Sequence, residues 1–326
     1  MTQSNHAWRP LAYTTLLLAA FSLMASQTAH AGPLRDWLTS RHAQGAPAST
    51  DDNATEDDDQ LARIDQLPAN SRVIKDIAYG SDPKQRYDVY LPAKPNNAPV
   101  IFMVHGGAWA IGDKRHSKVI ENKIRHWVTQ GTVLVSVNYR LVPDAAPLEQ
   151  AQDVARALAS AQQKAKEWGA NPQRFVLMGH SAGAHLVGLI SSQPDLAKQK
   201  GALPWLGSVM LDSAAMDVVS IMESKHHHRF YDKAFGNDPA YWRQTSPLHV
   251  LQPNTAPMLL VCSSKRDDSC PQAEAFAKAV INNRAIANVL PENLSHSDIN
   301  GELGLPNGYT KDVDQFLASL PGFKRP

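Results

Sequence analysis

Short, continuously apolar runs that alternate with helical patterns limit what this chain of 326 residues can fold into. The apolar runs cover residues 98–107, 133–139, 174–179, 207–212 and 257–263. Apolar side chains recur at helical spacing in residues 116–131, 147–170, 182–192, 271–283 and 310–320. Strands that are apolar on both faces and alternate with helices are typical of a parallel sheet covered by helices on both sides. The pattern therefore predicts the α/β class.

Three further segments complete the predicted sheet. Residues 73–80 and 86–92 alternate apolar and polar side chains, which indicates an antiparallel, half-exposed hairpin, and residues 286–292 form one more strand. We expect about eight strands, mostly parallel, with the first two antiparallel. The irregular pattern of residues 213–255 predicts loops and short helices over the C-terminal edge of the sheet, where open α/β sheets bind ligands.

The N-terminal part of the chain differs from the rest. Residues 1–31 carry one charge, Arg9, ahead of an apolar run and end on small residues, which is the pattern of a secretory signal peptide. The run is shorter than the roughly 20 residues of a membrane span, so we expect no span after cleavage. Residues 32–60 are acidic and poor in large apolar side chains, which predicts a disordered linker. Residues 61–326 should form the folded domain of an exported protein, periplasmic or secreted.

Charge and cysteine content exclude several classes of protein. The predicted domain has a mild excess of basic residues but no basic cluster, so nucleic acid is not an expected partner. In an exported protein, the two cysteines of the chain, Cys262 and Cys270, are more typical of a disulfide than of a metal site. The run of histidines at 226–228 lacks a fourth ligand and is expected to be a solvated loop. We expect neither a metal nor a cofactor.

The segment Gly179-His180-Ser181-Ala182-Gly183 lies between a buried strand and a helix. A nucleophilic serine on a sharp turn requires this strand–turn–helix context, with small residues two positions before and after it. The following helix directs its N-terminus at the serine and favours negative charge there. The pattern predicts that Ser181 is a nucleophile.

A serine nucleophile needs a base and an acid, which follow it along the chain in this kind of fold. His296 is the one histidine after the strand at 257–263, and it lies in a polar loop behind the last strand. For the acid we prefer Asp267, which follows the strand at 257–263, with its neighbour Asp268 as the local alternative. Asp212, which ends the preceding predicted strand at 207–212, is a third candidate.

Residues 105–109, with the sequence HGGAW, follow another buried strand and predict an oxyanion hole. The glycines let the backbone N–H groups of Gly107 and Ala108 approach a reacting oxygen, and a third N–H would come from Ala182. Trp109 and His180 are expected to line the substrate pocket, although Trp109 could equally be packed in the core.

These segments together resemble a known family. HGGAWAIGDKR, VNYRLVP, GHSAGAHL, DDSCP and LSHSDINGELG are similar to motifs of the α/β-hydrolase superfamily, closest to exported bacterial carboxylesterases of the feruloyl-esterase-like branch, near the hormone-sensitive-lipase and kynurenine-formamidase groups. The resemblance covers nearly all of residues 62–324. It implies Ser181 as nucleophile, His296 as base and Asp267, four residues before Pro271, as acid. A third glycine is usual where Ala108 stands, and the chain lacks the long N-terminal helical cap of those lipases, so the resemblance implies a small cap or none.

The sequence therefore predicts a serine carboxylesterase that acts on a small-molecule ester, of short-acyl or aryl and feruloyl type. An arylformamidase that uses the same three residues on an N-formyl aromatic amide is an alternative. A catalytically inactive binding module on the same scaffold is another, but such modules typically lose the serine or the histidine, and this chain retains both.

Overall fold

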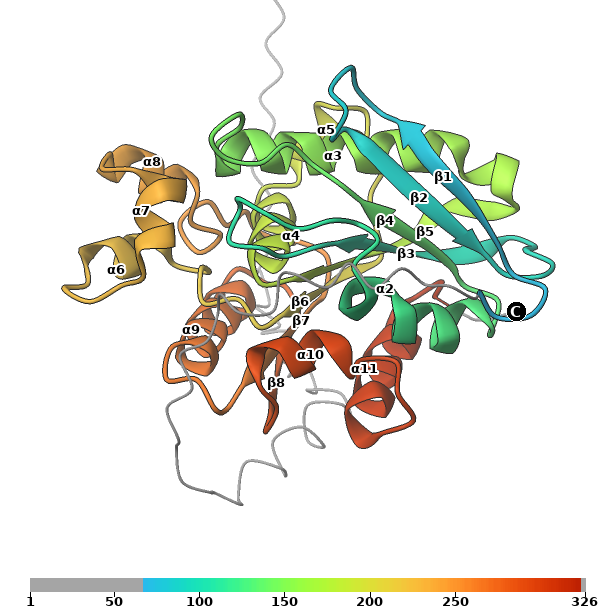
Figure 1. Ribbon diagram of the computed structural model, residues 1–326. Coiled ribbons are helices and arrows are strands. Elements are labelled where there is room, and N and C mark those ends of the chain that lie inside the picture. Colours follow the sequence, from blue (N-terminus) through green and yellow to red (C-terminus); the bar gives the residue numbers. More distant parts are fainter. Residues whose placement is uncertain (1–66, 324–326) are drawn as a thin grey trace, which may run out of the picture.

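Eight strands form one twisted sheet in the computed structural model, which describes residues 67–323 (Figure 1). The order across the sheet is β1-β2-β4-β3-β5-β6-β7-β8. The strands are β1 (Arg72–Ala78), β2 (Arg86–Leu91), β3 (Ala98–Val104), β4 (Val133–Val137), β5 (Ala170–His180), β6 (Gly207–Leu211), β7 (Met258–Ser263) and β8 (Ala287–Glu292). All of the predicted strands are present.

The strand directions confirm the predicted topology. β1 pairs with β2, and β2 with β4, in antiparallel fashion. Every pair from β4 across β3 to β8 is parallel. All residues of β3, β4, β6 and β7 are buried, as the continuously apolar runs require. The carboxyl ends of these parallel strands therefore meet at one edge, where the chain can gather side chains from several loops.

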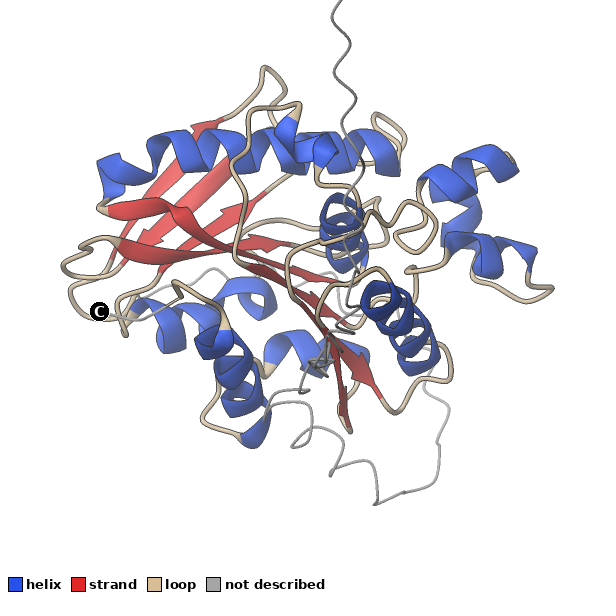
Figure 2. Ribbon diagram, turned by 180° about the vertical axis from the view of Figure 1, so that it is seen from behind, coloured by secondary structure: helices blue, strands red, loops and turns tan. Residues whose placement is uncertain are grey.

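Helices cover both faces of the sheet, as Figure 2 shows from behind. One apolar cluster packs α3, α4 and α9 against one face, and a second packs α2, α10 and α11 against the other. The helices are α2 (Ser117–Lys123), α3 (Pro147–Lys164), α4 (Ala182–Ser192), α5 (Asp195–Lys198), α6 (Val218–Glu223), α7 (Arg229–Phe235), α8 (Pro239–Gln244), α9 (Ser269–Asn282), α10 (His296–Gly301) and α11 (Gly308–Ser319). This three-layer arrangement is the predicted α/β architecture.

Two predicted helices end earlier than the sequence pattern indicated. The helix expected over 116–131 is α2 followed by a π-helical turn, Ile124–Val128. The helix expected over 147–170 is α3 followed by a 3-10 turn, Ala165–Trp168, and it ends at Gly169, which has a φ of 73°. Glycine adopts this left-handed conformation at low cost, so β5 can begin at the next residue.

The chain between β6 and β7 leaves the sheet and forms α6, α7 and α8, which lie beyond its edge in Figure 1. The prediction of loops and short helices over 213–255 is confirmed, and the three helices make a small cap. The predicted signal peptide, residues 1–31, and the predicted linker, residues 32–60, lie outside the described residues. Within residues 67–323, no helix is long and apolar enough to span a membrane.

Candidate active site

Ser181 occupies the sharp turn between β5 and α4 that its sequence context predicts. Its φ of 53° and ψ of −120° lie outside the regions that residues with a side chain ordinarily adopt. The turn is tied to the neighbouring strand, because the backbone N–H of Ser181 donates to the Leu211 carbonyl oxygen at 2.9 Å. Ser181 is thereby fixed at the carboxyl edge of the sheet, beside the end of β6.

The two glycines that flank Ser181 are required by close backbone packing. A Cβ on Gly179 would lie 2.3 Å from the carbonyl oxygen of Gly183, and one on Gly183 would lie 2.3 Å from the carbonyl oxygen of Val104. A Cβ on Gly106 would lie 2.9 Å from the Cβ of Ser181. No larger residue fits without moving backbone, so the serine turn and the loop after β3 touch directly.

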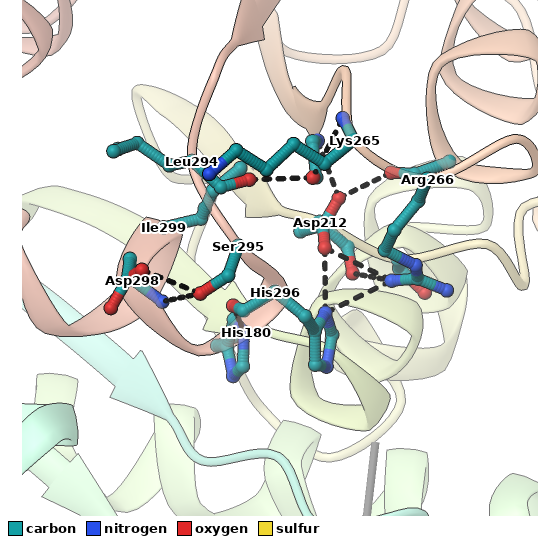
Figure 3. A network of polar contacts seen from close by, with 12 residues as sticks. His180, Asp212, Lys265, Arg266, Leu294, Ser295, His296, Asp298 and Ile299 are labelled. Atoms are coloured by element: carbon teal, nitrogen blue, oxygen red, sulfur yellow. Dashed lines mark hydrogen bonds and ion pairs between the residues drawn. The ribbon is translucent and has the colours of Figure 1, made fainter. Parts of the chain in front are cut away.

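The carboxylate that pairs with His296 belongs to Asp212. Nδ1 of His296 lies 2.6 Å from Oδ2 of Asp212, a fully buried residue that directly follows β6 (Figure 3). The preferred acid of the sequence analysis, Asp267, is exposed, and Asp268 pairs instead with Arg266. The sequence analysis was therefore wrong about which carboxylate contacts His296, and its third candidate takes that place.

The physical reason lies in the order of the strands. β6 is the direct neighbour of β5, so an acid at the end of β6 lies next to the serine turn at the end of β5. The loop after β7 is one strand further away. It turns Arg266, and not Asp267, toward Asp212.

Four donors surround the carboxylate of Asp212. Oδ1 accepts from the backbone N–H of Ser263 at 2.6 Å and from the hydroxyl of Ser269. Oδ2 accepts from His296 and, at 2.9 Å, from Nη1 of Arg266. Burial on its own would raise the pKa of Asp212, but the hydrogen bond from His296 and the charge of Arg266 outweigh it and hold the pKa far below its ordinary value. The surroundings of Asp212 therefore favour its ionised form.

These contacts also fix the proton on His296. Nη1 of Arg266 lies 2.9 Å from Nδ1 of His296, but a guanidinium nitrogen can only donate. Nδ1 donates to the carboxylate of Asp212, which is the shorter contact, so Arg266 directs its own hydrogen bond to Asp212. Nε2 of His296 forms no hydrogen bond with any residue in 67–323 and remains available as a base.

His296 begins α10 instead of lying in the predicted loop. The preceding Ser295 caps this helix by accepting the backbone N–H of Asp298 through its side chain. Side chains of α2, the neighbouring helix in the same layer, hold α10 in place. The contacts run from Lys118 Nζ to Ser297 Oγ (2.6 Å), from Asn122 Nδ2 to the Gly301 carbonyl oxygen (2.6 Å) and from Lys123 Nζ to the Asn300 carbonyl oxygen (2.7 Å).

Ser181, Asp212 and His296 line one cavity of about 210 Å³ together with the loop after β3. The predicted oxyanion donors, Gly107, Ala108 and Ala182, line the same cavity. Their backbone N–H groups form no hydrogen bond within the described part of the chain. Gly107 and Ala108 have φ values of 111° and 46°, which turn the loop sharply. The cavity thus brings together the predicted nucleophile, base and oxyanion donors, but neither Asp267 nor Asp268 lines it.

Aromatic side chains form one wall of the cavity. Phe230 and Tyr231 reach it from α7, and both rings lie against Trp109. Trp109 lines the cavity as predicted, but only 2% of it is exposed, so most of its ring is packed in the core. His180 also lines the cavity and contacts the carbonyl oxygen of His296 through Nε2 at 2.9 Å.

Cys262 and Cys270 form a disulfide, with their Cα atoms 5.1 Å apart, as predicted. The bond closes the loop that carries Ser263, Arg266 and Ser269, three of the donors to Asp212. Nothing in the sequence marked these three residues, because their role depends on which acid they surround.

The structure offers no metal site in its described part, where no group of three or more His, Cys, Asp or Glu side chains is arranged to hold an ion. Of the three histidines at 226–228, His226 and His228 are exposed and His227 pairs with Asp232. They lie in the loop before α7, which agrees with the prediction for this run.

Comparison with known proteins identifies relatives of the chain. The chain is 24% identical over 273 residues to the probable isoprenylcysteine alpha-carbonyl methylesterase ICMEL1 of Oryza sativa subsp. japonica, covering 77% of this chain and 63% of that protein. It is 28% identical over 217 residues to esterase LipQ of Mycobacterium tuberculosis, covering 62% of this chain and 51% of that protein. The chain thus spans between about half and two thirds of the length of these two relatives.

Solved structures share the fold. Thermogutta terrifontis esterase 2 superposes with a TM-score of 0.64 at 20% identity, over 81% of this chain and 99% of that chain. A truncated carbohydrate esterase from gut microbiota superposes with a TM-score of 0.65 at 16% identity, over 77% of this chain and 97% of that chain. These likenesses show the α/β-hydrolase fold. The BD-FAE family profile matches residues 87–279, which is more than half of the sequence, and the chain therefore belongs to the BD-FAE family.

Proposed function

We propose that this protein is a serine carboxylesterase in which Ser181, His296 and Asp212 form the catalytic triad. The observation that carries the proposal is the 2.6 Å contact between Nδ1 of His296 and buried Asp212, in a cavity that Ser181 also lines. A serine on a strained turn and a histidine oriented by a buried carboxylate are the parts that nucleophilic catalysis requires.

In the proposed reaction, the hydroxyl oxygen of Ser181 attacks the carbonyl carbon of the ester while Nε2 of His296 takes its proton. The tetrahedral intermediate collapses, the alcohol leaves with the proton returned by His296, and an acyl-enzyme remains. A water molecule, deprotonated by the same nitrogen, then releases the acid and restores Ser181. Asp212 stays ionised and stabilises the protonated ring in both steps.

The negative charge on the intermediate needs donors that are already in place. We assign this role to the N–H groups of Gly107, Ala108 and Ala182, which border the cavity and have no other partner among the described residues. The positive end of α4 adds to the field at the same point. Loss of one such donor typically costs about 3 kcal/mol of transition-state stabilisation.

The cavity supports a small acyl group as the bound part of the substrate. Its volume of about 210 Å³ is below the usual range for drug-sized ligands. The wall formed by Trp109, Phe230 and Tyr231 is aromatic, and stacked rings are favourable there. We therefore propose esters with a short acyl chain or a single aromatic ring.

Substitution of the triad tests the proposal. Ser181→Ala and Asp212→Asn should lower kcat on p-nitrophenyl acetate by about 10³-fold or more, because the acylation chemistry depends on both groups. Asp267→Asn is the matched control, since this carboxylate is exposed and its neighbour Arg266, not Asp267 itself, bonds to Asp212. A variant Asp212→Asn that folds and retains activity within tenfold of the wild type would refute the assignment.

A fluorophosphonate probe and a pair of substrates separate this proposal from its alternatives. Labelling of the wild type but not of Ser181→Ala supports a serine hydrolase, and absence of labelling would favour an inactive binding module. Faster turnover of N-formylkynurenine than of p-nitrophenyl esters would favour an arylformamidase.

We also propose that the protein works outside the cytoplasm. The disulfide between Cys262 and Cys270 supports this location, because such bonds persist in oxidising compartments. Cell fractionation should find the protein in the periplasm or the medium, with its N-terminus near residue 32. Retention of the whole chain in the cytoplasm would contradict both the location and the predicted signal peptide.

A further inference from the structure

His185 joins three parts of the molecule that meet at the cavity. It is fully buried on α4, one turn after Ser181, whose carbonyl oxygen accepts its backbone N–H at 3.1 Å. Its ring Nδ1 lies 3.1 Å from the indole Nε1 of Trp109, and its ring Nε2 lies 2.7 Å from the carbonyl oxygen of Thr245. One side chain therefore connects the serine helix, the loop at 105–109 and the end of the cap.

The partners of His185 determine where its proton is. An indole nitrogen only donates and a carbonyl oxygen only accepts, so Nδ1 must be unprotonated and Nε2 must carry the hydrogen. A second proton on Nδ1 would face the N–H of Trp109. Burial lowers the pKa of His185 to about 4, although the hydrogen bond to Thr245 acts in the opposite direction. The ring is neutral at neutral pH, with each nitrogen matched to its partner.

Trp109 links His185 to the loop after β3, because it belongs to that loop and donates to His185. Ala108 and Trp109 both have positive φ values, 46° and 62°, which residues with a Cβ adopt only when their surroundings impose it. The carbonyl oxygen of Trp109 accepts from Gln150 Nε2 at 2.9 Å and from the backbone N–H of Val142 at 3.0 Å. Those contacts hold its backbone, and His185 supplies the polar contact that fixes its ring.

We infer that His185 is a positioning residue for the loop at residues 105–109, called the oxyanion loop below. Through its contact with Trp109, His185 holds this loop next to Ser181. The inference rests on the proposed function, since the loop is the proposed source of two oxyanion donors. His185 touches none of the reacting atoms. It sets the place of Gly107 and Ala108 through a contact to the next residue along the chain.

Two substitutions separate the two contacts of the ring. His185→Asn places an amide oxygen near the position of Nδ1, so it can still accept from Trp109 but no longer reaches Thr245. His185→Gln places an amide N–H near the position of Nε2, so it can still reach Thr245 but leaves the indole N–H buried without a partner. Trp109→Phe removes that N–H and retains most of the ring.

Activity per intact site is the first readout. Active sites are counted by titration with a phosphonate, and kcat and KM for p-nitrophenyl acetate are measured on that basis. We expect His185→Gln to lower kcat at least tenfold with KM changed less than threefold, and His185→Asn to retain kcat within threefold. In the Trp109→Phe background, His185→Gln should add less than a twofold further loss. Equal losses of kcat in both His185 variants, or a kcat of His185→Gln within twofold of the wild type, would overturn the inference.

Ser191→Ala is the matched control for a purely structural effect. Ser191 is buried on the same helix and bonds to Ser208 at 2.7 Å, so its loss should lower the melting temperature without changing kcat per titrated site.

The second readout does not need catalysis, so it decides the inference even if the proposed esterase activity fails. The indole N–H of Trp109, assigned by its loss in Trp109→Phe, is followed by NMR hydrogen exchange. It should be protected in the wild type and in His185→Asn and exchange at least tenfold faster in His185→Gln. Equal protection in all three proteins would show that His185 does not hold Trp109. Protection as expected without labelling by a fluorophosphonate would reject the proposed function alone.

Discussion

Removing the disulfide should damage stability and catalysis together, because the bond closes the loop that surrounds Asp212. Cys262 and Cys270 are eight positions apart. For a loop of this length, the chain-entropy model gives a stabilisation of about 2.5 kcal/mol. For a domain of this size, that corresponds to a fall in melting temperature of about 5 to 10 °C. The catalytic effect is separate, since Ser263, Arg266 and Ser269 all donate to Asp212 from this loop.

A loosened loop should weaken at least one of these charge-assisted hydrogen bonds. One such bond is worth about 1.5 kcal/mol, which corresponds to roughly a tenfold loss of kcat if it orients His296 through Asp212. The variant Cys262→Ala/Cys270→Ser is measured by thermal denaturation and by kcat per phosphonate-titrated site. The wild type treated with a phosphine reductant should behave in the same way, and the reductant should leave the double variant unchanged.

The two effects can fail independently. A double variant with a lowered melting temperature but an unchanged kcat would refute the link between the loop and Asp212. An unchanged melting temperature would refute the stability argument.

Two further predictions follow from packing and charge. Gly183→Ala should lower the free energy of unfolding by about 1–3 kcal/mol and remove activity, because its Cβ would lie within 2.4 Å of the carbonyl oxygens of Val104 and His105. Gly188→Ala on the same helix, where the nearest atom is a flexible side-chain sulfur at 3.2 Å, should retain both, and similar losses in the two variants would contradict this reasoning. Burial lowers the pKa of Lys123 from 10.5 to about 7, so the folded chain binds fewer protons than the unfolded chain between these values and its stability rises with pH there. Relative to Lys123→Met, the wild type should gain about 2 kcal/mol in free energy of unfolding between pH 7 and pH 9, and urea denaturation that gives equal differences at both pH values would contradict this.

The sequence was sufficient to predict those features that depend on residues close together along the chain. The sharp turn at Ser181 could be predicted because a buried strand, two glycines and a helix start stand next to one another along the chain. The alternation of apolar runs and helical patterns likewise predicted the eight strands and their directions. His296 could be selected because it is the one histidine behind the strand at 257–263.

The carboxylate that pairs with His296 could not be selected in this way, because its identity depends on contacts between distant segments. The spacing to Pro271 favoured Asp267, but that residue is exposed. Asp212 lies 84 positions before His296, and only the adjacency of β5 and β6 brings this carboxylate beside the serine turn. The contact between Trp109 and His185 is likewise long-range, over 76 positions.

The small cap begins and ends on neighbouring strands, and this has a consequence for how the protein could acquire new substrates. The chain leaves the sheet after Leu211, where β6 ends, and returns at Met258, where the parallel neighbour β7 begins. A replacement segment therefore needs only to bridge two fixed anchor points, without shifting any strand. The contact from His185 uses the backbone carbonyl of Thr245, which any amino acid could provide. The cap could thus be replaced as one segment. Grafting the cap of a homologue into this chain should transfer the acyl preference of that homologue, while the sheet and the loops that carry Ser181, Asp212 and His296 stay unchanged.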